Sequence, residues 1–365
     1  MRAAIVGSGL AALTVYATLR RGGLEPGEIA VFGTDSDPAA AWRPRAEAIR
    51  QLWMRSESDG HCLPASFPGL AVREALRRRT PVPLVLTLVD RYRPTVDDFL
   101  EHVDEVRARS GWERSLHLAR IERIRARDGG FELDGHGGFR HVVVAPGHPG
   151  LNMPAPYRDD PRAVHCYQPH EYADRVAVVG AGMAAATEWL NALAAGSEVV
   201  SVRRREPERR PLNVPRPLFT KRGLAAFHGL AARARVARLE ELSQPSYPPG
   251  RAWDEPLERA VREGRFRVEE EANGSAQVIC ATGFLRGFRH DRLLARLVEE
   301  HGLETHERWI ALAPDGSVPA LTDETRTLAL CGVPAQWAFP AADTLTGAKY
   351  VARRVLQRVL RCPTR

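Results

Sequence analysis

The chain has 365 residues, which suits two domains of ordinary size, and its contents of 44% apolar and 27% charged residues exclude wholesale disorder. No run of about 18 apolar residues occurs, so we expect no transmembrane helix and no membrane partner. The formal net charge of +7 suits phosphate-bearing ligands, but basic residues do not alternate with aromatic ones as on nucleic-acid-binding surfaces, so we expect no nucleic-acid partner.

The first predicted elements are a strand, a glycine turn and a helix. An apolar run over residues 2–6 leads into the turn, a helical stretch extends to residue 21, and a second strand follows over residues 28–32. The turn consists of Gly7, Ser8, Gly9, Leu10, Ala11 and Ala12. This is the G-x-G-x-x-A arrangement, in the strand–turn–helix context that a dinucleotide-binding unit requires.

The next segments are less regular. Residues 35–93 are rich in Pro, Arg and Trp and predict loops and short helices that cross a ligand. Residues 95–109 predict a helix with Thr95 and Asp98 as its capping pair. Segments that alternate like strands follow at residues 116–133 and 139–144.

The strand–turn–helix pattern then occurs a second time. An apolar run over residues 175–179 precedes the turn, a helix extends to residue 195, and a second strand covers residues 198–202. This turn consists of Gly180, Ala181, Gly182, Met183, Ala184 and Ala185. The later predicted elements are strands at residues 277–280 and 327–331 and a final helix at residues 346–360.

Both glycine turns have the chemistry of a phosphate cradle. The first glycine permits a tight turn out of the strand, and the second, without a Cβ, lets a pyrophosphate approach the backbone. The helix that follows offers unpaired N–H groups and about half a positive charge at its N-terminus. We therefore predict two dinucleotide sites; the alternative is a glycine-rich turn between packed elements, which would have to occur twice.

The residues after each second strand suggest different ligands. Arg203 and Arg204 stand where an acid would read a ribose 2′-hydroxyl, and arginines there suit a 2′-phosphate, which favours NADPH over a merely solvated basic loop. In the first unit the acid position holds Gly33. Asp35, or as the second choice Asp37, reaches the ribose instead; the alternative for Asp35 is a residue that caps a turn.

The cysteines exclude two kinds of site. Five cysteines lie far apart and none forms a C-x-x-C pair, so neither a dithiol redox pair nor a zinc ribbon is supported, and we expect no metal. A reducing, cytoplasmic setting is the natural expectation. Cys280 and Cys331 lie in predicted buried strands and are expected to be inert.

The two units, and several shorter motifs, resemble the class B flavin monooxygenases and related FAD-dependent oxidoreductases over most of the chain. Ala40-Ala41-Trp42-Arg43 resembles the Gly-Gly-x-Trp segment beside FAD in that family, and Ala145-Pro146-Gly147 resembles its first Ala-Thr-Gly crossover. Ala281-Thr282-Gly283 closes the second unit in the same way. The C-terminal FAD contacts of the family resemble segments that contain Gly332, Thr346 and Gly347.

Two departures from the family pattern concern function. Gly33 replaces the ribose-binding Glu, and the Phe-x-Gly part of the linker motif is missing before His165, which weakens a specific monooxygenase assignment. The resemblance places His61 and Arg55 near the flavin and His165 on the nicotinamide side. We take these three as candidate catalytic residues; the alternatives are a surface loop for His61 and a structural interdomain histidine for His165.

The resemblance implies an α/β fold in which an NADPH-binding domain is inserted into an FAD-binding domain. We place the FAD domain at residues 1–160 and 284–365, a linker at 161–173 and the NADPH domain at 174–283. The implied activity is NADPH-driven, monooxygenase-type oxygenation of a small organic substrate with molecular oxygen, through a peroxyflavin. The alternatives are a flavin reductase or dehydrogenase without oxygenation, and a non-catalytic nucleotide-binding protein; a homodimer is the default assembly.

Overall fold

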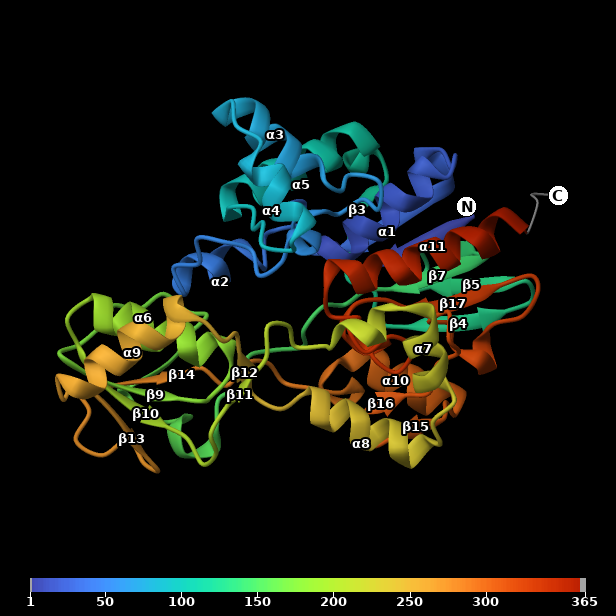
Figure 1. Ribbon diagram of the computed structural model, residues 1–365. Helices are drawn as coiled ribbons and strands as arrows, with labels where there is room; N and C mark the ends of the chain where they lie inside the picture. The colour runs from blue at the N-terminus through green and yellow to red at the C-terminus, as the bar shows by residue number, and fades with distance from the viewer. Residues whose placement is uncertain (1, 362–365) are drawn as a thin grey trace.

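Short apolar runs form the central strands of two lobes, each built on a five-stranded parallel sheet (Figure 1). The computed structural model describes residues 2–361. The inner strands of the first lobe are buried along their whole length, and those of the second lobe along most of it, because helices and loops cover both faces of a parallel sheet. The predicted α/β class is therefore confirmed.

The first lobe contains strands from both halves of the chain. Its sheet has the order β17-β7-β1-β2-β3, and a small antiparallel sheet, β4-β5-β6, accompanies it. The large sheet comprises β1 (Ala3–Val6), β2 (Ile29–Gly33), β3 (Leu116–Leu118), β7 (His141–Val144) and β17 (Thr327–Leu330). The small sheet comprises β4 (Ile124–Arg127), β5 (Gly130–Leu133) and β6 (Gly138–Phe139). Helices α1 (Leu10–Arg21) and α11 (Leu345–Arg361) pack against each other over the large sheet.

The second lobe repeats the arrangement with the order β13-β10-β9-β14-β8. Its strands are β8 (Ala163–His165), β9 (Arg175–Val179), β10 (Glu198–Val202), β13 (Phe266–Glu269) and β14 (Gln277–Cys280). Helices α6 (Met183–Ala194) and α9 (Arg251–Arg262) pack against each other, and Trp189 of α6 is fully buried against Tyr247 and Phe266. The predicted linker thus contains an edge strand, since β8 pairs with β14.

A helical arm stands above the first lobe (Figure 1). It comprises α3 (Gly69–Arg78), α4 (Val82–Leu88) and α5 (Val96–Ser110), while α2 (Arg43–Ala48) lies between this arm and α6 of the second lobe. The predicted cap of α5 is confirmed, because the Thr95 side chain accepts a hydrogen bond from the Asp98 backbone N–H at 3.0 Å. The segment expected to hold only loops and short helices carries the ten-residue helix α3.

One segment of the predicted inner domain packs elsewhere. Leu224 and Phe227 of α7 (Lys221–His228) and Leu239 and Leu242 of α8 (Ala232–Leu242) join the core cluster of the first lobe. They lie beside α10 (Arg292–His301) in Figure 1. The remaining strands are β11 (Glu208–Arg209), β12 (Ser246–Tyr247), β15 (Thr305–His306) and β16 (Trp309–Ile310).

The strand orders place a crevice at the same point of both sheets. In the first sheet, β1 lies between β2, which follows it in the chain, and β7, which comes later. In the second sheet, β9 lies between β10, which follows it, and β14, which comes later. At such a switch point the connections leave in opposite directions beyond the carboxyl ends of the strands. Gly7 follows β1 there, and Gly180 follows β9.

Two further properties concern the described residues as a whole. Between residues 2 and 361, no helix is both long and apolar enough to cross a membrane. Cys62, Cys166, Cys280 and Cys331 are buried and unpaired, and burial raises the pKa of the Cys280 thiol to about 11 and that of the Cys331 thiol to about 12. Cys362 lies outside the described residues.

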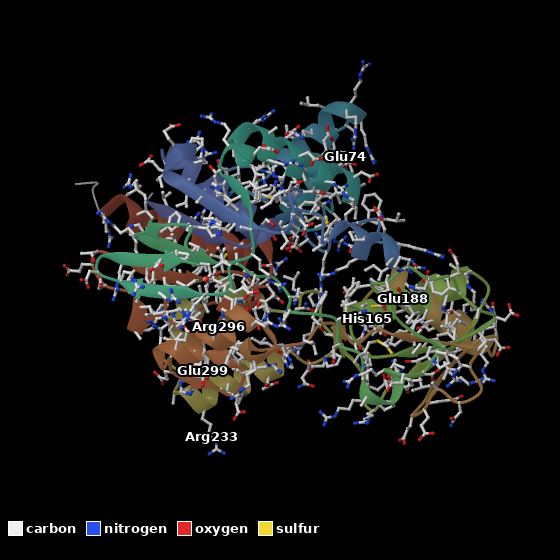
Figure 2. The ribbon with its side chains drawn as sticks, turned by 180° about the vertical axis from the view of Figure 1, so that it is seen from behind. Glu74, His165, Glu188, Arg233, Arg296 and Glu299 are labelled. Carbon is white, nitrogen blue, oxygen red and sulfur yellow. The ribbon has the colours of Figure 1, made fainter. Side chains whose placement is uncertain are left out.

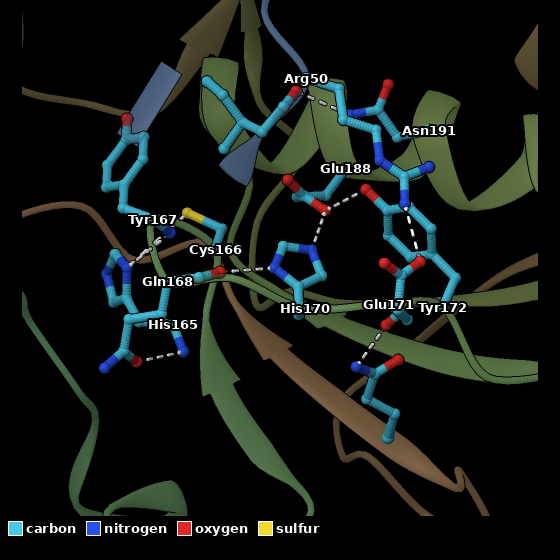
Figure 3. Close-up of polar contacts among 12 residues, drawn as sticks. Arg50, His165, Cys166, Tyr167, Gln168, His170, Glu171, Tyr172, Glu188 and Asn191 are labelled. Atoms are coloured by element: carbon cyan, nitrogen blue, oxygen red, sulfur yellow. Dashed lines mark hydrogen bonds and ion pairs between the residues drawn. The ribbon is translucent and has the colours of Figure 1, made fainter. Parts of the chain in front are cut away.

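A buried polar cluster joins the two lobes where α2 meets α6 (Figure 3). His170 donates through Nε2 to the Glu188 carboxylate at 3.1 Å, and the Tyr172 hydroxyl donates to the same oxygen at 2.9 Å. The Asn191 side-chain amide donates to the Ile49 carbonyl oxygen of the first lobe at 2.8 Å. Burial alone lowers the pKa of His170, but its hydrogen bonds to Glu188 and to a backbone carbonyl outweigh burial and raise the net pKa.

This cluster predicts pH-dependent stability. A histidine whose pKa is raised in the folded state contributes stability that is complete below its unfolded pKa of about 6.5 and is lost as pH rises through the folded pKa. Glu188→Gln removes the charge that holds the proton on His170. We expect the substitution to lower the midpoint of thermal unfolding at about pH 6 and to have a smaller effect at about pH 9. An effect of equal size at both pH values would contradict the assignment.

Candidate functional site

The first glycine of each turn is enforced by the neighbouring strand. Gly7 has φ 118° and Gly180 has φ 133°, values that side-chain-bearing residues rarely adopt. A Cβ on Gly7 would also collide with the Ala145 carbonyl oxygen beyond β7, and one on Gly180 with the Ala281 carbonyl oxygen beyond β14. The two turns therefore have the same tight contact with the chain that leaves the adjacent strand.

The second glycine of each turn faces open space. A Cβ built on Gly9 or Gly182 has no heavy atom within 4 Å. These glycines are also the N-caps of α1 and α6, and no side chain caps either helix. The N–H groups of the first helical turn therefore stay available for an anion. Ala12 and Ala185, at the third position, are buried in the lobe cores and expose no atoms.

The first glycine turn opens into a cavity of about 610 Å³. The residues predicted to bind the first dinucleotide that line this cavity are Gly7, Ser8, Gly9, Leu10, Ala11, Asp35, Trp42, Gly147 and Gly332. Trp42 is half-buried and presents its ring edge-on to Phe99 at a centroid distance of 5.0 Å. Arg55 lines the same cavity.

The structure explains why an acid is missing after β2. A Cβ on Gly33 would collide with the side chain of Ser8, so a glutamate at position 33 and a serine at position 8 exclude each other. The Ser8 hydroxyl instead accepts a hydrogen bond from the Asp35 N–H at 3.4 Å. Asp37 is the turn-capping acid, since its carboxylate accepts from the Ala39 N–H at 2.8 Å. The exposed Asp35 carboxylate stands at the cavity rim and accepts a hydrogen bond from the neighbouring Thr34 hydroxyl at 3.1 Å.

The second glycine turn opens into a cavity of about 520 Å³. The predicted residues that line it are Gly147, Gly180, Gly182, Met183, Ala184, Thr282 and Gly283. Arg203 and Arg204 lie outside this lining. Arg203 pairs with Glu206 at 2.8 Å and lies over the Trp189 ring, whereas the Arg204 side chain is exposed.

The two cavities share one wall. Six residues line both: Pro146, Gly147, His148, Asp291, Val333 and Asp343. Arg55 of the first cavity donates to the side-chain oxygen of Asn213 of the second at 2.6 Å. Ligands in the two cavities would therefore meet at this wall, and the turns do not open onto unrelated surfaces.

An aromatic stack stands at the shared wall. Phe284 lies between His148, at a centroid distance of 3.8 Å, and Tyr167, at 5.1 Å, and the Arg45 guanidinium lies 5.0 Å from its centroid. Burial lowers the pKa of His148 to about 4, so this imidazole is neutral near pH 7. His165 is buried behind the stack and contacts the Gly283 carbonyl oxygen through Nε2 at 2.9 Å. Figure 2 shows His165 on the side of the second lobe that faces the first.

Four charged side chains cluster beside the first cavity. Burial lowers the pKa of Arg55 and Lys349 and raises the pKa of Asp59 and Asp343. Two guanidinium nitrogens of Arg55, Nε and Nη2, are buried without a hydrogen-bond partner among the described residues. These nitrogens and the Asp343 carboxyl are polar groups that a ligand at the shared wall would satisfy.

Some predicted site residues lie elsewhere. His61 lines neither of these cavities; it is fully buried, 3.9 Å from Glu57, and borders a separate cavity between α1, α3 and α5. Arg43 lines neither cavity, but it pairs at 3.3 Å with Asp37, which lines the first. Thr346 and Gly347 do not line the first cavity. Gly347 packs instead against the backbone of Ala341 and Ala342, where a Cβ would collide. Thr344, Leu345 and Ala348 line it at the start of α11.

Sequence reasoning missed several residues of the shared wall. His148 and Asp343 belong to no sequence motif. They are part of the site because the folded chain places both of them in the lining of the two cavities. Asn213, in the proline-rich loop after β11, also lines the second cavity.

No protein-family model matches the chain, and no curated protein matches it in sequence. Solved structures match its fold. The ornithine hydroxylase of Pseudomonas aeruginosa has 17% sequence identity and a TM-score of 0.69 and covers 98% of this chain and 99% of its own. The Kutzneria sp. 744 ornithine N-hydroxylase, in a complex with reduced FAD, NADP+ and L-ornithine, has 15% identity and a TM-score of 0.72, with 98% of each chain covered. The bacillithiol disulfide reductase of Bacillus cereus has 14% identity and a TM-score of 0.60, again with 98% of each chain covered. The chain therefore has the α/β fold that these two hydroxylases and this reductase share.

Proposed function

We propose that this chain is an FAD-dependent oxidoreductase that is reduced by NADPH. The observation that carries the proposal is the shared wall, because two phosphate cradles open into cavities that meet at Gly147, His148 and Asp343. A non-catalytic nucleotide-binding protein has no need for two such cavities in contact. The solved structure with a similar fold that contains FAD and NADP+ supports the same assignment.

The residues of the first cavity fit FAD. Gly9 leaves room for a pyrophosphate above the uncapped start of α1, and Asp35 and Ser8 offer polar groups at the ribose end. The second cavity fits NADPH in the same way through Gly182 and α6, with Arg204 free at the end of β10 for a 2′-phosphate. We propose residues 1–160 and 284–365 as the FAD domain and 174–283 as the NADPH domain, with α7 and α8 packed on the former.

When both cofactors are bound, the pair supplies hydride transfer and the reduction of an acceptor such as oxygen. The chain's own side chains then stabilise negative charge, hold a proton and position the backbone at the shared wall. Arg55 places a buried positive charge at the first cavity, with two guanidinium nitrogens that have no hydrogen-bond partner among the described residues, where negative charge can be stabilised. Asp343, whose pKa is raised by burial, retains its proton to higher pH and can transfer it at the shared wall. His165 fixes Gly283, the residue before Phe284, through its carbonyl.

We propose monooxygenase-type oxygenation of a small organic substrate as the reaction. The support is the fold shared with an ornithine hydroxylase and an ornithine N-hydroxylase. The fold shared with a bacillithiol disulfide reductase favours a second candidate, NADPH-dependent reduction without oxygenation. We further propose that the protein is located in the cytoplasm and forms a homodimer.

Cofactor content and electron transfer test the assignment directly. We expect purified protein to carry FAD, to show flavin absorbance, and to lose that absorbance when NADPH is added without oxygen in a stopped-flow measurement. With oxygen and the right substrate, oxygen uptake should match product formation; release of all the oxygen as hydrogen peroxide would favour the reductase. A colourless protein that takes up no FAD on reconstitution would refute both.

The two glycines that face open space allow the cavities to be blocked one at a time. Gly9 and Gly182 have extended backbone conformations that valine tolerates, and no atom obstructs the new Cβ. We expect Gly9→Val to abolish FAD binding. Gly182→Val should keep FAD but weaken NADPH by about tenfold or more in a reduction assay. Each variant is the control for the other, and identical losses in both would contradict separate sites.

Arg203 and Arg204 predict the choice between NADPH and NADH. We expect Arg203→Ala with Arg204→Ala to raise the KM for NADPH about tenfold and to leave that for NADH nearly unchanged. Arg267→Ala, which removes an arginine paired with Glu269 in the same lobe, serves as control. An equal effect on both coenzymes would refute the recognition of a 2′-phosphate.

A further inference from the structure

The helical arm carries an apolar surface that nothing in the proposed function uses. Residues 80–89 contain no charged side chain, and they form α4 and the turns beside it. Leu88 is 86% exposed and Leu76 of the adjacent α3 is 75% exposed. The other exposed apolar side chains of this surface, which we name the arm patch, are Val72, Val82, Leu84, Val85 and Val89. Contiguous apolar surface of this kind on a folded protein marks an interaction site.

The hydrophobic face of α4 is not needed for its own packing. Leu86 turns inward and packs with Leu70, Ala71 and Tyr92. Tyr92 donates to the buried Glu74 carboxylate at 2.6 Å, and Arg78 pairs with the same carboxylate at 2.9 Å. Figure 2 shows Glu74 within the arm, away from both sheets. These contacts hold α3 and α4 together, and the side chains of the arm patch lie on the opposite, exposed face.

Arginines flank the arm patch at both ends. Residues 67–93 contain six arginines and only two acidic residues. Arg73 and Arg77 are paired with Glu105 and Asp98 of α5. Arg79, just before the uncharged run, and Arg91, just after it, are exposed and have no acidic partner among the side chains described. An apolar helix between unpaired arginines has the composition of a segment that lies in a membrane interface.

The charges decide against a second copy of the chain. A two-fold contact of one arm patch on another would bring the unpaired Arg79 and Arg91 of both copies together, and these like charges repel. An anionic surface attracts them instead. The seven-residue α4 spans about 10 Å, against about 30 Å for a bilayer core, so it can only lie along the interface.

We propose that the arm patch docks this protein on the surface of an anionic phospholipid bilayer, with the apolar side chains of α4 inserted among the acyl chains and Arg79 and Arg91 at the headgroups. The sequence predicted no membrane partner because it contains no apolar run long enough to span a bilayer. The uncharged run of the arm patch is shorter than such a span, and a segment that lies on the bilayer surface does not need that length. The proposal does not depend on the identity of the reaction.

Flotation of the full-length protein with vesicles tests the docking. We expect it to float with vesicles of phosphatidylcholine and phosphatidylglycerol, to stay behind with phosphatidylcholine alone, and to be released by high salt. Val85→Asp with Leu88→Asp should weaken binding about tenfold or more, and Arg79→Glu with Arg91→Glu should remove the dependence on phosphatidylglycerol. Val261→Asp, at an equally exposed valine on α9 of the other lobe, should bind like the wild type.

Three outcomes would overturn the proposal. The first is wild-type protein that does not float with the anionic vesicles. The second is Val85→Asp, Leu88→Asp protein that floats like the wild type while retaining its unfolding temperature. The third is wild-type protein that ignores vesicles but forms a dimer that the same two substitutions dissociate, or binds poly-aspartate, since then a second copy or an acidic protein covers the patch.

Discussion

The molecule depends on one steric contact that occurs twice. Where β1 ends, the chain must turn beneath the Ala145 carbonyl oxygen, and where β9 ends it must turn beneath the Ala281 carbonyl oxygen. Only a residue without a side chain and with positive φ fits. That contact holds the exits of two adjacent parallel strands together, so the following helix begins at the crevice and directs its free N–H groups into it. Both cavities, and therefore their common wall, follow from this arrangement.

The shared wall is where the cavities of the two lobes meet. Its residues come from the crossover after β7, from the start of α10, and from the segment before α11, which are far apart in sequence. The Arg55–Asn213 hydrogen bond and the Asn191–Ile49 contact tie the lobes on either side of the wall. The proposed hydride transfer requires the two lobes to keep a fixed separation, and the polar cluster around Glu188 (Figure 3) connects them through the Asn191–Ile49 hydrogen bond.

Local patterns predicted the elements whose shape is decided locally. Both strand–turn–helix units, the Thr95 cap of α5 and the buried strand β17 could be read from spacing and side-chain type. The features that the sequence could not predict depend on neighbours distant in sequence. The loss of the acid at Gly33 is understandable only beside Ser8, and the packing of α7 and α8 on the first lobe leaves no mark in their periodicity. His61 was placed near the flavin by resemblance, yet the fold turns it toward α5.

The pairing of α1 with α11 has a consequence for biosynthesis. Arg2 donates to the Val359 carbonyl oxygen at 2.9 Å, and Leu356 fills the space that a side chain on Gly22 would take. β1 and α1 therefore cannot complete their packing until α11, more than 300 residues further along the chain, has left the ribosome. The strands of the second lobe all lie between residues 163 and 280, so its sheet can form before α11 of the first lobe has been synthesised.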